Sequence, residues 1–106
     1  MNIQNINQEK KLKQLLQEKR EEILQIAAKH GAFNVRVFGS VARGEETEDS
    51  DIDFLIDYDL KNISSWFPVG LVQDLEDLLK CKVDVVTEQG LKERIRDQVL
   101  QDCILL

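Results

Sequence analysis

The chain has 106 residues and a formal net charge of −6, with a pI near 4.8. Such an acidic balance argues against broad nucleic-acid binding, which needs a basic surface. No apolar run approaches the roughly 20 residues of a membrane span, and the N-terminus lacks the apolar segment of a secretory signal. We therefore expect a single cytoplasmic domain over residues 1–106 that contacts neither membrane nor nucleic acid directly.

The first predicted element is a helix from Gln8 to His30, with Asn5 or Asn7 as its candidate cap. Apolar residues recur along it at helical spacing and predict one buried stripe, formed by Leu12, Leu15, Leu16, Ile23, Ile26 and Ala27. The interleaved lysines and glutamates predict a solvated face. His30 followed by Gly31 predicts the end of the helix, with the histidine as a cap and not a general base.

The stretch from Val35 to Asp59 carries the most informative pattern. An apolar strand ends in Gly39-Ser40, and ten residues later the pair Asp51 and Asp53 opens a second apolar strand. Residues i and i+2 of a strand share a face, so the two carboxylates project together about 6.5 Å apart at the backbone. They repel each other unless a divalent cation lies beside them, and Mg²⁺ prefers such oxygen ligands. The pattern predicts a site for a nucleoside triphosphate and magnesium, with two ions expected.

The Gly39-Ser40 turn is the predicted phosphate side of this site. Glycine allows the backbone to approach a phosphate closely, and Ser40 adds a hydroxyl and the amide groups that follow it. Arg43 either adds charge or braces the loop. Residues 45–59 include eight acidic residues and no basic one, so a bound cation would relieve repulsion. The acidic residues at 45–49 are expected in a solvated loop, with Ser50 capping or orienting the backbone of Asp51.

The second strand predicts the core. Its residues Ile52, Phe54, Ile56 and Tyr58 share the face opposite the aspartates, so helices are expected over that face while the carboxylate face stays open. The next segment, 60–68, is a predicted loop in which Trp66-Phe67 is interpreted as a buried plug, with a partner contact and then a base-stacking platform as the alternatives. A helix with apolar spacing follows Pro68 and continues to Lys80.

The C-terminal part holds a third carboxylate. Residues 82–86 read as a strand in which Asp84 lies opposite Val83 and Val85, where it is either a functional acid or paired with an arginine. Thr87 is the predicted cap of a last helix ending near Cys103. The apolar tail, 104–106, either folds back on the core or docks in a partner. Cys81 and Cys103 match no metal spacing and are predicted to be buried, reduced thiols.

Motif and spacing together resemble the nucleotidyltransferase superfamily of DNA polymerase beta type. In that superfamily a Gly-Ser turn precedes an Asp-x-Asp pair, and a third carboxylate lies on a later strand. The GSVARG and Ser-Asp-Ile-Asp (50–53) wordings in a short chain resemble the MNT group, the antitoxin half of HEPN–MNT toxin–antitoxin pairs. The resemblance covers the chain from about Leu12 onward. It implies an α/β (α+β), polymerase beta palm-like domain: a short mixed twisted sheet covered by helices on one face.

The resemblance also implies an activity, namely transfer of AMP from ATP, with Mg²⁺, to a tyrosine hydroxyl of a cognate HEPN ribonuclease toxin, which is thereby neutralised. The residues carried over as catalytic and metal-binding are Asp51, Asp53 and Asp84, with Asp84 as ligand or as base; those carried over as nucleotide-binding are Gly39, Ser40 and Arg43. Val41 departs from the family's common GSRARG wording, so Arg43 is left as the phosphate-side charge.

Two other functions are compatible with these residues. One is nucleotidyl transfer to a small-molecule hydroxyl, as in aminoglycoside nucleotidyltransferases, although those need an extra domain for the drug. The other is a non-catalytic antitoxin that inhibits by masking the toxin, which the apolar tail and Trp66-Phe67 would suit. Replacement of Asp51 and Asp53 by asparagine separates a catalytic from a masking antitoxin.

Overall fold

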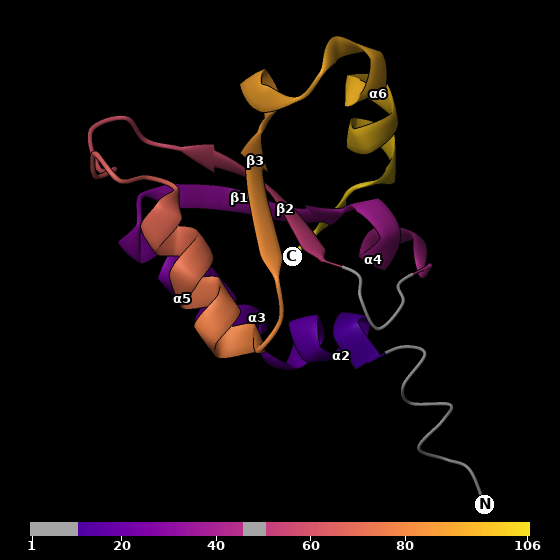
Figure 1. Cartoon of the computed structure of the whole chain (residues 1–106), viewed down its shortest axis with the longest axis horizontal. Helices are drawn as coiled ribbons and strands as arrows, with labels where there is room; N and C mark the ends of the chain where they lie inside the picture. The colour runs from indigo at the N-terminus through magenta and orange to yellow at the C-terminus, as the bar shows by residue number, and fades with distance from the viewer. Residues whose placement is uncertain (1–10, 46–50) are drawn as a thin grey trace, which may run out of the picture.

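A computed structural model of the chain describes residues 11–45 and 51–106 (Figure 1). Its strands are β1 (Ala32–Phe38), β2 (Ile52–Tyr58), β3 (Val83–Thr87) and β4 (Ile104–Leu105), which form one mixed sheet in the order β3-β2-β1-β4. β1 pairs antiparallel with β2 and β4, and β2 pairs parallel with β3. Its helices are α2 (Lys11–Glu18), α3 (Arg20–Lys29), α4 (Gly39–Arg43), α5 (Val69–Leu79) and α6 (Glu93–Asp102), with the 3-10 turn η1 (Glu88–Gly90).

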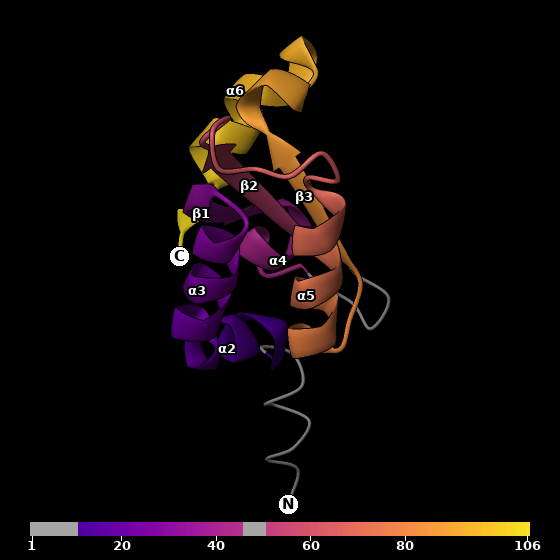
Figure 2. The ribbon, with the colours of Figure 1, turned by 90° about the vertical axis from the view of Figure 1, so that its left-hand side faces the viewer.

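The core lies between the sheet and the helices α2, α3 and α5, which gather on one side of it while α6 lies on the other (Figures 1 and 2). The strand residues that face α3 and α5 alternate with those of the opposite face; the buried ones are Val35, Val37, Ile52, Phe54, Ile56, Val83 and Val85. Ile23, Leu71 and Leu75 meet them from α3 and α5. The predicted core face of β2 is therefore confirmed, with Tyr58 half-buried at its end.

The N-terminal helix is not continuous as predicted, because α2 and α3 meet at Lys19, which has φ −100° and ψ 10°. The change of direction brings α2 against both α3 and α4, so that Leu16 is buried at 3% exposure. His30 caps α3 as predicted, and its Nε2 also lies 2.7 Å from Asp74 Oδ2 in α5. The candidate caps Asn5 and Asn7, the start at Gln8 and the loop residues 46–50 lie outside the described residues.

The prediction of a buried Trp66-Phe67 plug is wrong for Trp66, whose side chain is 75% exposed. Only Phe67 turns inward, where it packs on the core with its ring 5.4 Å from that of Tyr58. Of the two aromatic residues, Phe67 alone therefore contributes to the core. Pro68 precedes α5 as its N-cap residue.

At the C-terminal end, the apolar tail folds back on the core. Ile104 and Leu105 form the edge strand β4 against β1, and Leu106 is buried at 8% exposure. Its amide donates to the carbonyl of Val35 at 2.9 Å, and its carbonyl accepts from Arg20 Nε at 2.9 Å. Thr87 caps the short turn η1 by accepting from Gly90 N, and α6 begins later than predicted, at Glu93.

Two further expectations need correction. Cys81 and Cys103 are free thiols, as predicted, but each is only half-buried. The face of the sheet that carries the aspartates is not open along its whole length, since Leu55 on that face is completely buried. None of the helices in the described ranges has the length and apolar character that crossing a membrane requires.

Candidate active site

Three aspartates gather at one end of the sheet face that points away from α3 and α5. Asp53 in β2 is the register partner of Asp84 in β3, and Asp51 stands immediately before β2. Register partners on neighbouring strands lie side by side on one face, with the strands about 4.8 Å apart. On its other side Asp53 pairs with Phe38, directly before the Gly39 turn. The tertiary structure thus brings together residues that the sequence separates by up to 45 positions.

Asp53 is the most perturbed acid of the group. Burial, followed by repulsion from Asp84 and Asp51, raises the pKa of Asp53 from 3.8 to about 6, and Arg43 acts in the opposite direction. Asp51 and Asp84 are exposed. Among the described residues, none of the three carboxylates has an ion-pair partner, so the predicted alternative of an arginine beside Asp84 is not seen. An acid whose pKa is raised by burial and by neighbouring like charges is typical of a functional site.

Gly39 is fixed by two independent constraints. Its φ of +76° lies in the left-handed region, where a side chain is disfavoured. A Cβ at this position would also overlap Asp53 Oδ2 and lie 3.3 Å from Asp53 Cγ. Any larger residue would therefore push the Asp53 carboxylate away, which explains why a glycine must stand beside it.

Ser40 and Arg43 belong to α4, the short helix that opens at Gly39. The carbonyl of Ser40 accepts from Glu45 N at 2.8 Å, and Arg43 Nε donates to Glu45 Oε1 at 2.9 Å. Both charged side chains of that pair are about half exposed. Arg43 therefore braces the loop after α4 and also lowers the pKa of Asp53, so it fits both roles considered for it.

The chemistry of the donor set fits Mg²⁺, because three carboxylates on one face offer only oxygen ligands and an excess of negative charge. Repulsion from Asp84 and Asp51 adds to the larger effect of burial in raising the pKa of Asp53, and Arg43 offsets the rise only in part. Within residues 11–45 and 51–106, however, no three His, Cys, Asp or Glu side chains converge on a single point. The fit therefore rests on the donor types and their shared face and not on a finished coordination shell.

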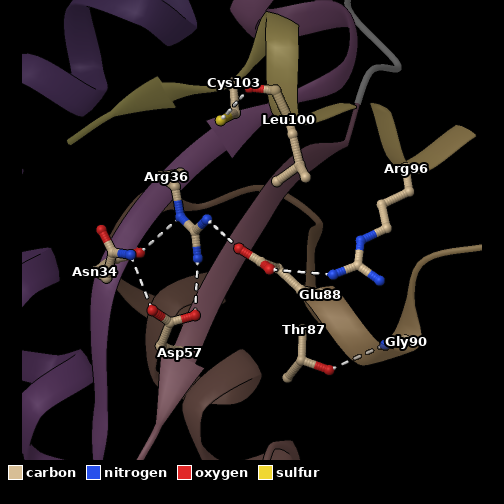
Figure 3. Close-up of polar contacts among 9 residues, drawn as sticks. All are labelled: Asn34, Arg36, Asp57, Thr87, Glu88, Gly90, Arg96, Leu100 and Cys103. Atoms are coloured by element: carbon tan, nitrogen blue, oxygen red, sulfur yellow. Dashed lines mark hydrogen bonds and ion pairs between the residues drawn. The ribbon is translucent and has the colours of Figure 1, made fainter. Parts of the chain in front are cut away.

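The other half of the same face holds an ion-pair network that the sequence analysis did not predict (Figure 3). Arg36, whose side chain is 10% exposed, donates to Asn34 O, Asp57 Oδ1 and Glu88 Oε1, each at 3.0 Å. Arg96 of α6 lies 3.5 Å from the other oxygen of Glu88. The network ties β1, β2, η1 and α6 together on the face of the sheet that also carries the buried Leu55. One signal was present: Arg36 alternates with apolar residues in its strand and so faces away from the core.

Fold and site together define a nucleotidyl-transferring domain, with a Gly-Ser turn held against the first residues of an Asp-x-Asp strand and a third aspartate on the neighbouring strand. The family model described as "Nucleotidyltransferase domain" matches residues 10–106, and the chain belongs to this family. Its substrate class is therefore a nucleotide, as the sequence analysis predicted.

The names of individual relatives are more specific than the description of the family. The chain is 37% identical over 81 residues to "Protein adenylyltransferase MntA" of Thermococcus cleftensis, covering 76% of this chain and 80% of the relative. It is 46% identical, with a TM-score of 0.76, to a solved structure named "putative minimal nucleotidyltransferase", covering 90% of this chain and 95% of that one. A toxin–antitoxin complex with AMP-PNP shares the fold at a TM-score of 0.64 and 22% identity, over 83% of this chain and 69% of that one.

Proposed function

We propose that the chain is an antitoxin that transfers AMP from ATP, with Mg²⁺, to a tyrosine hydroxyl of a HEPN ribonuclease toxin. The observation that carries the proposal is the uncompensated carboxylate group at Asp53, built against the bare backbone of Gly39. Similarity to a protein adenylyltransferase over most of both chains supports the donor and the acceptor class. The shared fold of a toxin–antitoxin complex that contains AMP-PNP supports a toxin as the partner.

The position of each residue of the candidate site supports a particular role in the reaction. Gly39 and Ser40 would receive the β- and γ-phosphates, with Arg43 as the one neighbouring cation of α4. Asp51 and Asp53 would hold the metal ions, and Asp84 would complete the set. When bound, Mg²⁺ supplies charge neutralisation on the phosphates at the attacking and the leaving oxygens. Catalysis would be mainly positioning plus charge neutralisation.

The reaction itself is one in-line displacement. The acceptor oxygen forms a bond to the α-phosphorus while the bond from that phosphorus to the bridging oxygen of the β-phosphate breaks, and pyrophosphate leaves with the electron pair. The hydroxyl proton passes to a carboxylate. Asp84 suits this part as base because its exposed side chain lies beside Asp53 on the open end of the face.

The deciding measurement is the intact mass of the HEPN-type protein encoded beside this chain after incubation with this protein, ATP and magnesium. We expect a gain of one or more AMP units, lost when Asp51→Asn and Asp53→Asn are combined. Asp77→Asn, on the exposed side of α5, is the matched control and should leave the gain intact. No gain with the parent chain, while the two proteins co-purify, would favour the masking antitoxin instead.

A further inference from the structure

Two adjoining hollows lie at the end of the strands away from the aspartates. One, of ≈ 420 Å³, lies between β3 and the connection from β2 to α5, and is lined in part by Ile63 and Phe67. The other, of ≈ 330 Å³, includes Phe33 and Asp57. Tyr58 and Leu60 line both hollows, so the two form one continuous surface. We call the surface made by Phe33, Asp57, Tyr58, Leu60, Ile63 and Phe67 the Leu60 surface.

Exposed apolar side chains concentrate around this surface. Among the described residues, seven large apolar side chains are exposed, and four of them belong to the Leu60 surface or to residues next to those lining it: Phe33, Leu60, Trp66 and Val69. Leu60 forms the ridge between the hollows and is 76% exposed. Apolar surface that is hollowed and gathered in one region marks an interaction site more often than scattered exposed residues do.

The rim of the Leu60 surface is acidic. Asp59 is exposed, and its carboxylate accepts from Lys61 N at 3.0 Å and from Asn62 Nδ2 at 2.6 Å, which are both uncharged donors. No ion pair involves Asp59 within the described part of the chain. Asp57 lines the second hollow, where Arg36 balances its charge. An occupant that presents an apolar side chain next to a basic one would match both the hollows and the rim.

Binding here would be separate from the chemistry. Tyr58 lies five positions after Asp53 in β2, or about 17 Å away at strand rise. A small substrate held at the aspartates would not fill the Leu60 surface, whereas a protein seated on it could still extend along the sheet to them. The occupant is therefore a macromolecule, and the net charge of −6 disfavours a nucleic acid.

We propose that the Leu60 surface is the docking site for the acceptor protein, which inserts an apolar side chain flanked by a basic residue. This proposal rests on the proposed function for the identity of the acceptor. It adds a recognition site that lies apart from the aspartates and that sets affinity for the acceptor without taking part in transfer.

The test compares two leucines of nearly equal exposure. Leu60→Asp changes the docking surface, and Leu105→Asp, 70% exposed on β4, is the matched control. Affinity for the adjacent HEPN-type protein is measured without ATP, so that no transfer intervenes, alongside circular dichroism of each variant. We expect Leu60→Asp to weaken the Kd about tenfold or more and Leu105→Asp to change it less than about twofold. An equal Kd for Leu60→Asp and the parent chain would overturn the proposal.

A second variant probes the charge on the rim. Asp59→Lys should lower the association rate constant about threefold or more at low salt and reduce its salt dependence. An unchanged rate would overturn the basic-residue part of the proposal. Loss of ATP affinity in Leu60→Asp with acceptor affinity retained would assign the hollows to the nucleotide. Dissociation of a dimer of this chain by Leu60→Asp, with acceptor affinity retained, would assign them to self-association.

The two proposals fail in different ways. If the proposed function is wrong, no AMP reaches the acceptor at any concentration, yet the binding comparison is still informative. If only the docking site is wrong, transfer occurs and Leu60→Asp leaves its KM unchanged. If both hold, Leu60→Asp raises the KM for the acceptor about as much as it raises the Kd and leaves the kcat unchanged.

Discussion

The sheet face opposite the core has two halves, and both carry carboxylate side chains. The carboxylates of one half are neutralised by an arginine, whereas, among the described residues, those of the other half are not. At one end, Asp51, Asp53 and Asp84 gather without a described ion-pair partner, and the pKa of Asp53 rises to about 6. At the other end, Asp57 and Glu88 share the buried guanidinium of Arg36. Both halves include residues of β2, in which Asp53 and Asp57 lie four positions apart. Carboxylates that the protein neutralises hold the structure together, whereas those that it leaves uncompensated are available to a cation.

The largest expected effect comes from Asp53→Asn, at the uncompensated end. Loss of one carboxylate should lower the rate of AMP transfer by about a thousandfold or more, because charge neutralisation at the reacting phosphate depends on it. Transfer is measured by intact mass of the acceptor over time. The partner variant Asp57→Asn, at the neutralised end, should keep the transfer rate at saturating acceptor. Equal losses of transfer rate in the two variants would show that the two halves of the face do not differ in function.

The free energy of unfolding, in contrast, should depend on the neutralised end of the face. Arg36→Met keeps an apolar stem but leaves Asp57 and Glu88 without their shared cation. We expect the free energy of unfolding to fall by about 2 kcal/mol, less than for a fully buried pair because the partner side chains are 38% and 33% exposed. Urea denaturation measures the change, and Arg94→Met on the exposed face of α6 is the control. A loss no larger than that of the control would contradict a stabilising role for the network.

The pH dependence of the free energy of unfolding should reveal the titration of Asp53. Its folded-state pKa of about 6 lies above the ordinary value of 3.8, so the folded chain binds this proton more tightly than the unfolded chain. Its stabilising contribution is complete below pH 3.8 and is lost as the pH rises through 6. In the absence of metal, Asp53→Asn should match the parent near about pH 4 and exceed it by about 1 kcal/mol at about pH 7, after allowance for solvent screening. A constant difference between the two chains across this range would show that Asp53 is not the titrating group.

The smallest effect is expected from the metal alone. Millimolar Mg²⁺ should raise the Tm of the parent by about 2–4 °C above pH 6, because it binds only the folded arrangement of the aspartates. Asp53→Asn should lose most of this shift, and Arg36→Met should keep it. Differential scanning calorimetry with and without EDTA makes the measurement. A shift of the same size in Asp53→Asn would place the ion elsewhere.

Local patterns in the sequence were enough to locate most of the candidate site. The spacing of Gly39-Ser40 and Asp51-x-Asp53 depends on alternation within one strand, which is a property of consecutive residues. The burial of Ile52, Phe54 and Ile56 follows from the same alternation. Asp84 was recognised because a lone acid in an apolar strand is unusual. The resemblance to the nucleotidyltransferases, carried by these same residues, was confirmed by the family match.

Several features were beyond the reach of local patterns, because each depends on which segments meet. Apolar residues keep helical spacing through α2 and α3, so the pattern did not indicate the break at Lys19 that places α2 against α4. Trp66 and Phe67 are adjacent aromatic residues, and only the packing of the folded chain distinguishes Phe67, beside Tyr58, from the exposed Trp66. The closure of half of the polar face required Arg36, Asp57 and Glu88 to meet from separate elements.

The sequence by itself was enough to predict which residues would hold phosphate and metal, and it determined which strand faces are apolar. The tertiary structure alone decided how charge is distributed between the two halves of one face, because a pKa depends on neighbours across strands and on burial. It also decided that the C-terminal tail joins the sheet as the edge strand β4 and that the exposed Phe33 and Leu60 line adjoining hollows. Alternation and spacing are read along the chain, whereas ion pairing, exposure and hollows arise only where distant parts of the chain are packed together.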